Sequence, residues 1–397
     1  MPLPCDPPAR PRARKIIATL AVWLAMCVAT AHAAQPSVEA LSGGKPFVPP
    51  SWFIEDVEVV GRYAYVANYP VGLGVIDVSN PTNCVWVGGY ATGGNPRRLD
   101  VQGKYAYLAK FNSGFDVIDV SDPTNCVRVG SYYAGFDSKG LTVADNHVYL
   151  ADGGNGLKVI NVSNPTNCVL VGGCSTGGFA YDVAVSGHYA YLVGAGSGLQ
   201  VVDVSEPTNC VHVGGFPSTN FAGGVAISGN YAYVATARYG LDIIDVSNPT
   251  NCVRVGGYKA SNGTWKLTMS RHYAYLANGF QGLQVIDVSD PANCVSVVNY
   301  NTRGMAAGVA VVADRIYVAN YMQGLLVLPT LTNLQFTVRV EAETNTPFTL
   351  EAATDLSGSG NWSPLVTTNV PAMPFDFVDF DVKLAEKPRK FYRVRQP

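Results

Sequence analysis

Charged side chains are scarce in this sequence of 397 residues. Lys, Arg, Asp and Glu together make up 14% of it, and the formal net charge at pH 7 is -2. A chain so poor in basic residues offers little to a phosphate backbone, so we expect no nucleic-acid partner. The hydrophobic fraction of 48% also disfavours a disordered chain, and the composition disfavours a coiled coil.

Long apolar runs are also rare. The prominent one, from Ile16 to Thr30, is shorter than the ~20 residues that a membrane-spanning helix needs. It follows four basic residues, Arg10, Arg12, Arg14 and Lys15, and precedes Ala31-His32-Ala33, whose small residues are typical of a signal-peptidase site. We predict a signal peptide that is cleaved after Ala33. The mature chain should then be exported to the periplasm, the cell surface or the medium, with no membrane span.

The sequence contains few residues and motifs that are typical of a catalytic site. The sequence has five histidines, one of them in the leader, and it contains no His-Glu-x-x-His, Gly-x-Ser-x-Gly or Walker-type motif. We therefore expect a protein that is not an enzyme and that carries no cofactor and no metal.

Glycine, proline and tyrosine are plentiful instead, with 41, 25 and 22 copies, a balance that suits short strands and tight turns. The string Gly-Leu-x-Val-Ile-Asp-Val-Ser-x-Pro-Thr-Asn-Cys recurs every 42 residues, and the seventh copy is degraded. No insertion or deletion separates the seven units. Their glycines are Gly72, Gly114, Gly156, Gly198, Gly240, Gly282 and Gly324.

Each unit has the pattern of four short strands. In the second unit these are residues 99–101, 105–109, 115–120 and 127–129, with Gly, Asn, Asp and Pro at the joints. This length and pattern are typical of one blade of a β-propeller, so we predict an all-β, seven-bladed propeller over residues 52–330. The seventh unit stops after Leu328. Its outer strand must come from Phe336–Val340 or from residues before Trp52, or be absent.

The segments Leu73–Asp77 and Leu283–Asp287 resemble the LVIVD repeat, a family of extracytoplasmic bacterial and archaeal proteins related in fold to WD40 and YVTN propellers. The resemblance implies a propeller outside the cell and brings no shared catalytic residues. In that family the residue after Pro-Thr-Asn is often Pro, whereas six units here have Cys.

The cysteines of the mature chain pose a question of pairing. Six of them recur at the 42-residue step, Cys84, Cys126, Cys168, Cys210, Cys252 and Cys294, and Cys174 is the seventh. An exported protein usually forms disulfides, but equivalent points on the outer strands of neighbouring blades lie too far apart for a disulfide or a metal ring. Cys168 and Cys174 share one extended segment, so they cannot pair either. We expect buried thiols that pack as small hydrophobic groups.

The two faces of the predicted ring differ in sequence. The Pro-Thr-Asn turns of the bottom face are nearly invariant, whereas the loops of the top face, where each innermost strand begins, differ between blades. Variation on a fixed scaffold indicates the face that carries function. The candidate site residues just before the innermost strands are Glu55, Asp56, Arg97, Arg98, Lys139, Tyr181, Asp182, Trp265 and Lys266. Other top loops add Tyr69, Lys110, Phe111, Asp152, Arg238, Tyr239, Phe280 and Tyr321.

Aromatic rings beside charged groups suit a protein or polysaccharide partner, which we place at the cell envelope or outside the cell. Three alternatives stay open. In the first, Glu55 and Asp56 pair with Arg97 and Arg98 of the next blade and serve the fold alone. In the second, the chain is an envelope scaffold whose partner binds the blade sides or the tail. In the third, Asp56 and Asp182 act as acid and base, or hold calcium, in a propeller hydrolase or lyase.

The remaining segments complete the predicted organisation. Residues 34–51 form a linker, and residues 331–397 form a small β-rich domain of sandwich type. The segments Asn361-Trp362 and Phe391–Val394 resemble a C-terminal module of exported, Verrucomicrobia-type bacterial proteins. Such a tail docks to the cell surface or caps the propeller.

Overall fold

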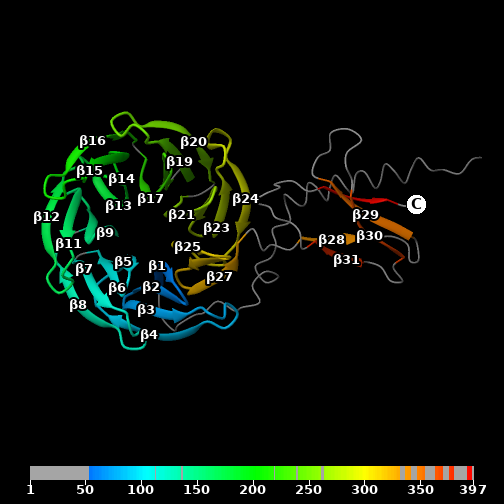
Figure 1. The fold of residues 1–397 in the computed structure, drawn as a ribbon, viewed down its shortest axis with the longest axis horizontal. Helices are drawn as coiled ribbons and strands as arrows, with labels where there is room; N and C mark the ends of the chain where they lie inside the picture. Colours follow the sequence, from blue (N-terminus) through cyan, green and yellow to red (C-terminus); the bar gives the residue numbers. More distant parts are fainter. Residues whose placement is uncertain are drawn as a thin grey trace, which may run out of the picture. The chain divides into compact units, whose positions relative to one another are not determined.

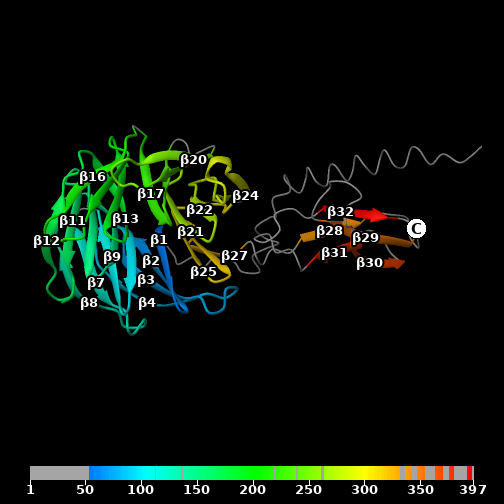
Figure 2. The ribbon, with the colours of Figure 1, turned by 45° about the horizontal axis from the view of Figure 1, so that its top comes forward.

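The computed structural model describes residues 53–330, except for 112, 136, 219, 238, 239, 261 and 262, together with five strand segments between residues 336 and 395. The chain divides into two compact units, and the larger one ends at Thr330. Its antiparallel sheets form a ring of seven blades around a central axis (Figure 1), and their strands run between the two faces of the ring (Figure 2). The predicted all-β, seven-bladed propeller is confirmed.

The first four blades are built as follows. Blade 1 comprises β1 (Phe53–Val60), β2 (Tyr63–Tyr69), β3 (Gly72–Asp77) and β4 (Val85–Ala91). Blade 2 comprises β5 (Pro96–Gln102), β6 (Tyr105–Lys110), β7 (Gly114–Asp119) and β8 (Val127–Tyr132). Blade 3 comprises β9 (Ser138–Ala144), β10 (His147–Asp152), β11 (Leu157–Asn161) and β12 (Val169–Cys174). Blade 4 comprises β13 (Phe179–Ser186), β14 (Tyr189–Ala195), β15 (Leu199–Asp203) and β16 (Val211–Phe216).

The other three blades complete the ring. Blade 5 comprises β17 (Ala222–Ser228), β18 (Tyr231–Thr236), β19 (Gly240–Asp245) and β20 (Val253–Lys259). Blade 6 comprises β21 (Lys266–Ser270), β22 (Tyr273–Ala277), β23 (Leu283–Asp287), the 3-10 turn η1 (Pro291–Asn293) and β24 (Val295–Tyr300). Blade 7 comprises β25 (Gly308–Val312), β26 (Arg315–Ala319) and β27 (Leu325–Pro329). In every blade the strands pair in sequence order, from the innermost outward.

The hydrophobic core lies between neighbouring blades. For example, Leu73 and Val75 of blade 1 pack against Leu108 and Ile118 of blade 2, and all four side chains are buried. Because each inner sheet is covered on both faces, its middle strands are almost continuously apolar rather than alternating. This explains the recurrent Tyr-Ala-Tyr and Val-Ile segments of the repeat.

Two side-chain turns shape the bottom connection between the two outer strands of most blades. In blade 2, Asp119 Oδ1 accepts a hydrogen bond of 2.9 Å from the backbone N–H of Ser121. Asp122 Oδ1 accepts one of 3.0 Å from the backbone N–H of Thr124. These are Asx turns, which fix the chain direction without help from the rest of the fold. The first recurs in blades 1, 3, 4, 5 and 6.

The same turn also locks neighbouring blades together. Its proline carbonyl packs so closely on a glycine of the preceding blade's outer strand that a Cβ there would overlap the carbonyl oxygen. Five successive interfaces share this contact, between Gly88 and Pro123, Gly130 and Pro165, Gly172 and Pro207, Gly214 and Pro249, and Gly256 and Pro291. The equivalent residue of blade 6 is Val298, and blade 7, which follows it, has no such turn in its sequence. The near-invariance of the bottom turns therefore has a structural cause.

The cysteines belong to this turn. All seven in the part of the chain that the structure describes are free, as predicted, but only Cys126 and Cys252 are buried and the other five are partly exposed. Cys126 Sγ lies 3.6 Å from the carbonyl oxygen of Pro123, and the other five repeat cysteines make the same contact within their own turns. Burial raises the pKa of Cys126 to about 11, so its thiol stays protonated and donates to the turn.

The ring closes by side-chain packing between blades 1 and 7. Ile54 and Val57 share a buried cluster with Tyr317 and Leu325. The backbone N–H of Ile54 donates to the carbonyl oxygen of Tyr321 at 3.2 Å. Among the described residues, this packing and this hydrogen bond join the two blades.

The outer strand of blade 7 had three candidate origins. The first, Phe336–Val340, forms β28 of the C-terminal unit, where it pairs with β31 (Phe375–Asp379). The second, residues before Trp52, lies outside the described residues. Within the described ranges, blade 7 is a sheet of three strands.

The C-terminal unit contains two small antiparallel sheets. One is the β28–β31 pair, and the other joins β29 (Pro347–Ala353), β30 (Ser363–Asn369) and β32 (Phe391–Arg395) in the order β30-β29-β32. Of the segments that carry the predicted resemblance, Asn361 and Trp362 lie outside the described residues. The resemblance to a Verrucomicrobia-type module stays a prediction.

Gly130→Ala tests the contact between turn and glycine. The new methyl group would overlap the carbonyl oxygen of Pro165, so we expect a loss of ~1–3 kcal/mol in the free energy of unfolding, the usual effect of overpacking. Urea unfolding measures it. Gly154→Ala is the matched control, because a Cβ at Gly154 meets no atom within 4 Å. Equal stability of the two variants would contradict the proposed lock.

Candidate functional site

A β-bulge at the start of the innermost strand sets the top face of most blades. In blade 1, Ile54 pairs with Asn68 and Asp56 pairs with Ala67, which leaves Glu55 as the extra residue. Arg97, Lys139, Tyr181 and Gly223 occupy the same bulge in blades 2 to 5. A bulge changes the direction of its side chain and frees it from the regular alternation. In blades 1 to 4 the predicted site residues therefore lie at this bulge or directly after it, whereas Trp265 and Lys266 of blade 6 lie at the start of a strand with regular pairing.

The acidic residues after the bulge join neighbouring blades. Asp56 Oδ2 accepts a hydrogen bond of 3.2 Å from the backbone N–H of Leu99, one blade further on. Asp182 Oδ2 accepts one of 3.1 Å from Val225 in the same way. Both aspartates are buried. They act as latches across the blade interfaces.

Two cations reach across the axis to these aspartates. Lys266 of blade 6 pairs with Asp56 of blade 1, although blade 7 lies between them. Arg98 of blade 2 has its Nε 3.9 Å from Oδ1 of Asp182 in blade 4, and its Nη2 donates to the carbonyl oxygen of Gly223 at 3.2 Å. We call Asp56, Arg98, Asp182 and Lys266 the axial cluster. It joins blades that are not neighbours in the ring.

Glycines make room for the axial cluster. A Cβ on Gly140 would lie 2.6 Å from the Cα of Asp182, and one on Gly308 would lie 2.8 Å from Oδ1 of Asp56. Both glycines occupy the position that carries the aspartate in the following blade. A glycine directly before each aspartate along the ring is therefore a packing requirement.

The structural alternative for the acidic pair is half correct. Arg97 Nη1 donates to Glu55 Oε1 at 2.9 Å, so these two residues of adjacent blades pair as that alternative expects. Asp56 pairs with Lys266, 210 residues away, instead of with Arg98. Sequence spacing pointed to the neighbouring blade, whereas the partner comes from across the axis.

The remaining predicted residues belong to a row of aromatic rings, the aromatic arc. It consists of Phe179, Tyr181, Phe221 and Trp265. The Tyr181 and Phe221 ring centroids are 4.6 Å apart, and those of Phe221 and Trp265 are 5.9 Å apart, both edge to face. Lys139 Nζ lies 3.7 Å from the centroid of Tyr181 and 5.0 Å from that of Phe179, a cation–π arrangement. The arc spans blades 4, 5 and 6, with Lys139 of blade 3 at its end.

Several large apolar side chains of the top face are exposed. They are Tyr133 at 70%, Trp265 at 45%, Phe280 at 80% and Met322 at 63%. All four lie in connections on the face where the innermost strands begin, whereas the other exposed large hydrophobic residues are Val and Leu within strands.

The sequence reading missed Phe179, Phe221, Tyr133 and Met322 because it weighed only the two residues before each inner strand together with selected loops. Tyr133, Phe221 and Met322 lie in the variable connections and Phe179 begins an inner strand, so their position next to the predicted top face was a signal in the sequence. Arg238 and Tyr239, which it did select, lie outside the described residues.

Acidic groups along the inner strands have perturbed pKa values. Burial raises the pKa of Glu58, on β1, to about 7; Lys266 opposes this shift, and Asp100 and Asp56 add to it. Burial also raises the pKa of Asp182 and of Asp100. Asp100 Oδ2 accepts a hydrogen bond of 2.8 Å from the backbone N–H of Val143, which repeats the latch at the next position down the strand.

The described part of the chain contains no group of three or more His, Cys, Asp or Glu side chains arranged to hold a metal ion. Among the same residues, no helix is long and apolar enough to cross a membrane. The arrangement provides latched carboxylates at the axis and a rigid aromatic surface beside them. That the nine predicted residues bind a partner stays a prediction.

The fold and its repeats define a class, the β-propellers built from 42-residue blades. The LVIVD repeat matches six consecutive segments, residues 54–92, 93–134, 135–176, 177–216, 221–260 and 263–302. These segments cover more than half of the chain, which therefore belongs to the LVIVD-repeat family.

No curated protein sequence matches this chain significantly. Among the similar solved structures is the crystal structure of the computationally designed Ika8 protein, in its first crystal packing in P63. It has a TM-score of 0.56 and 7% sequence identity, over 73% of this chain and 99% of that one. At this identity the likeness shows the fold alone.

Glu58 should make stability depend on pH. An unfolded chain releases the Glu58 proton near pH ~4.3, whereas the folded chain holds it up to about pH 7. Between these values the folded state binds more protons, so this carboxyl lowers the free energy of unfolding as pH rises.

Glu58→Gln should therefore stabilise the protein by over ~1 kcal/mol more at about pH 8 than at about pH 4.5. Urea unfolding at both pH values measures this, and Glu206→Gln, at an exposed turn, controls for the loss of one carboxylate. If the Glu58→Gln effect did not change with pH, the raised pKa would be wrong.

Proposed function

We propose that this chain is an exported, non-catalytic binding protein whose top face takes a protein partner at the cell envelope. The observation that carries the proposal is the exposure of Tyr133, Trp265, Phe280 and Met322 on connections of one face. Aromatic and methionine side chains are enriched at protein interfaces, where buried Trp and Tyr anchors contribute most of the affinity.

The scaffold suits this role because it holds the anchors in place. Trp265 packs edge to face on Phe221, and Phe221 packs on Tyr181, so the arc loses little side-chain freedom on binding. Lys139 and the half-exposed Arg97 add positive charge beside the rings. A partner with an apolar patch and an acidic edge fits this surface.

The polar side chains at the axis are already paired within the propeller, and this favours a protein partner over a polysaccharide. Sugar binding needs hydrogen-bonding groups beside the ring that stacks. At the axis, Asp56, Asp182 and Lys266 are engaged with each other's blades, and Phe280 and Met322 offer no hydrogen bond from their side chains. The same engagement of Asp56 and Asp182 argues against their use as catalytic acid and base.

Export rests on the leader, which lies outside the described residues. The basic residues before Ile16 and the small residues around Ala33 support it. Expressed with its leader in a bacterial host, the protein recovered outside the cytoplasm should begin at Ala34, as intact mass shows. A product that stays inside the cell with its leader attached would contradict export.

The top-face test compares partner capture by two matched double variants. Trp265→Ser with Phe280→Ser should reduce capture of envelope proteins by at least about tenfold, because it removes two exposed anchors. Val127→Ser with Val253→Ser is the control, since these residues are 48% and 50% exposed at the start of outer strands near the bottom turns. Cross-linking of the full mature chain, followed by mass spectrometry, identifies the partner and the face.

Three results would overturn the proposal. Equal loss in both variants would indicate an effect on folding or general stickiness. Loss in the control alone would favour the scaffold that uses its blade sides. Capture of envelope polysaccharides with no protein would make the class of partner wrong.

A further inference from the structure

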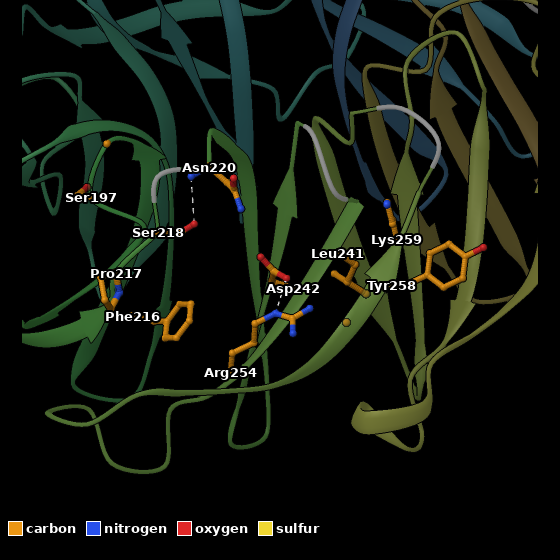
Figure 3. Close-up of a pocket in the computed structure, with 12 residues that line it drawn as sticks. Ser197, Phe216, Pro217, Ser218, Asn220, Leu241, Asp242, Arg254, Tyr258 and Lys259 are labelled. Atoms are coloured by element: carbon orange, nitrogen blue, oxygen red, sulfur yellow. Dashed lines mark hydrogen bonds and ion pairs between the residues drawn. The ribbon is translucent and has the colours of Figure 1, made fainter.

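An open groove of about 740 Å³ lies between blades 4 and 5, away from the innermost strands (Figure 3). Blade 4 contributes Phe216 at the end of β16, and the connection to blade 5 contributes Asn220. Blade 5 contributes Asp242 from β19, and Arg254 and Lys259 from β20. The volume is in the range of ~300–1,000 Å³ that small-molecule sites occupy.

The groove contains a charged pair that is open to it. Arg254 Nε lies 2.7 Å from Asp242 Oδ1, a pair across the two outer strands of blade 5. The side chains of Asp242 and Arg254 are 13% and 47% exposed. The pair is therefore formed but not sealed.

Blade 2 carries the same pair in sealed form. There, Arg128 Nε lies 3.1 Å from Asp116, and Lys110 Nζ holds the other oxygen of that carboxylate at 2.8 Å. The Asp116 side chain is only 1% exposed. In blade 5 the position of Lys110 is taken by Thr236, which is too short to cap the carboxylate. The Asp–Arg pair is thus buried and capped in blade 2, whereas in blade 5 it is open to the groove.

The geometry points to a carboxylated sugar, a hexuronate, as the occupant; this is our proposal. Figure 3 shows the flat ring of Phe216 beside the Asp242–Arg254 pair, with the amide of Asn220 directed toward the same space. An aromatic ring accepts the apolar face of a pyranose, and a carboxylate and an amide accept and donate to its hydroxyl groups.

The charge balance selects an acidic sugar. Arg254 and the exposed Lys259 bring two positive charges to the groove, against one negative charge from Asp242. Among the residues that the structure describes, Lys259 forms no ion pair. A sugar carboxylate would satisfy the excess positive charge through charge-assisted hydrogen bonds. The groove is separate from the aromatic arc, so this site goes beyond the top-face proposal.

The experiment uses the full mature chain and four probes, the methyl glycosides of glucuronic acid, galacturonic acid, glucose and galactose. Saturation-transfer NMR detects binding, and calorimetry measures it. At least one glucuronide or galacturonide should bind at least about tenfold more tightly than its neutral counterpart.

Variants locate the site. Arg254→Gln should weaken binding of that uronide by about tenfold or more, whereas Arg128→Gln, which breaks the sealed pair of blade 2, should leave it unchanged. Lys259→Ala changes an exposed residue, so it should fold and still weaken the binding severalfold. Trp265→Ser with Phe280→Ser should keep full uronide binding, which separates this site from the top face.

Four results would overturn the proposal. They are binding of none of the four glycosides, equal binding of the acidic and neutral ones, equal losses in Arg254→Gln and Arg128→Gln, and loss of uronide binding in the top-face variant.

Discussion

The contact between a proline carbonyl and a glycine of the preceding blade is the constraint on which five of the seven blade interfaces depend. It fixes the distance between neighbouring sheets at their outer edge, beyond the middle strands that carry most of the aliphatic core. The Asx turns hold the carbonyl in position, and the cysteine thiol donates to it from within the same turn. The short segment Asp-Val-Ser-x-Pro-Thr-Asn-Cys thus forms the turn, makes the contact with the preceding blade and sets the spacing between blades. This explains why it repeats with so little change.

The top of the ring is held by a second set of contacts that does not repeat. Asp56 and Asp182 latch onto the next blade, while Lys266 and Arg98 reach past a neighbour to blades further round. Buried ion pairs contribute little net stability, but an unpaired partner is costly, so each constrains which residues its neighbours carry. The top face therefore has different chemistry in each blade on an unchanged scaffold.

The sequence was sufficient for the fold and for part of the candidate site. A strict 42-residue period specifies equal blades, and from equal blades it follows that the repeat cysteines stay apart. It also located the top-face residues, because chain direction alone assigns each connection to a face. The pairing of Asp56 with Lys266 could not be predicted from the sequence, because it depends on how far the lysine side chain extends across the axis. The open Asp242–Arg254 pair goes with Thr236 at the position that Lys110 occupies in blade 2, a difference whose meaning appears only when the two blades are compared.

The bulge at the start of the inner strands has a consequence for how such a surface can change. An extra residue stands outside the ladder of hydrogen bonds, so its side chain is replaced without altering the pairing of either strand. Glu, Arg, Lys, Tyr and Gly already occupy this place in blades 1 to 5. The ring thus presents a circle of interchangeable positions, and a new specificity can be assembled one blade at a time without rebuilding the sheets beneath it.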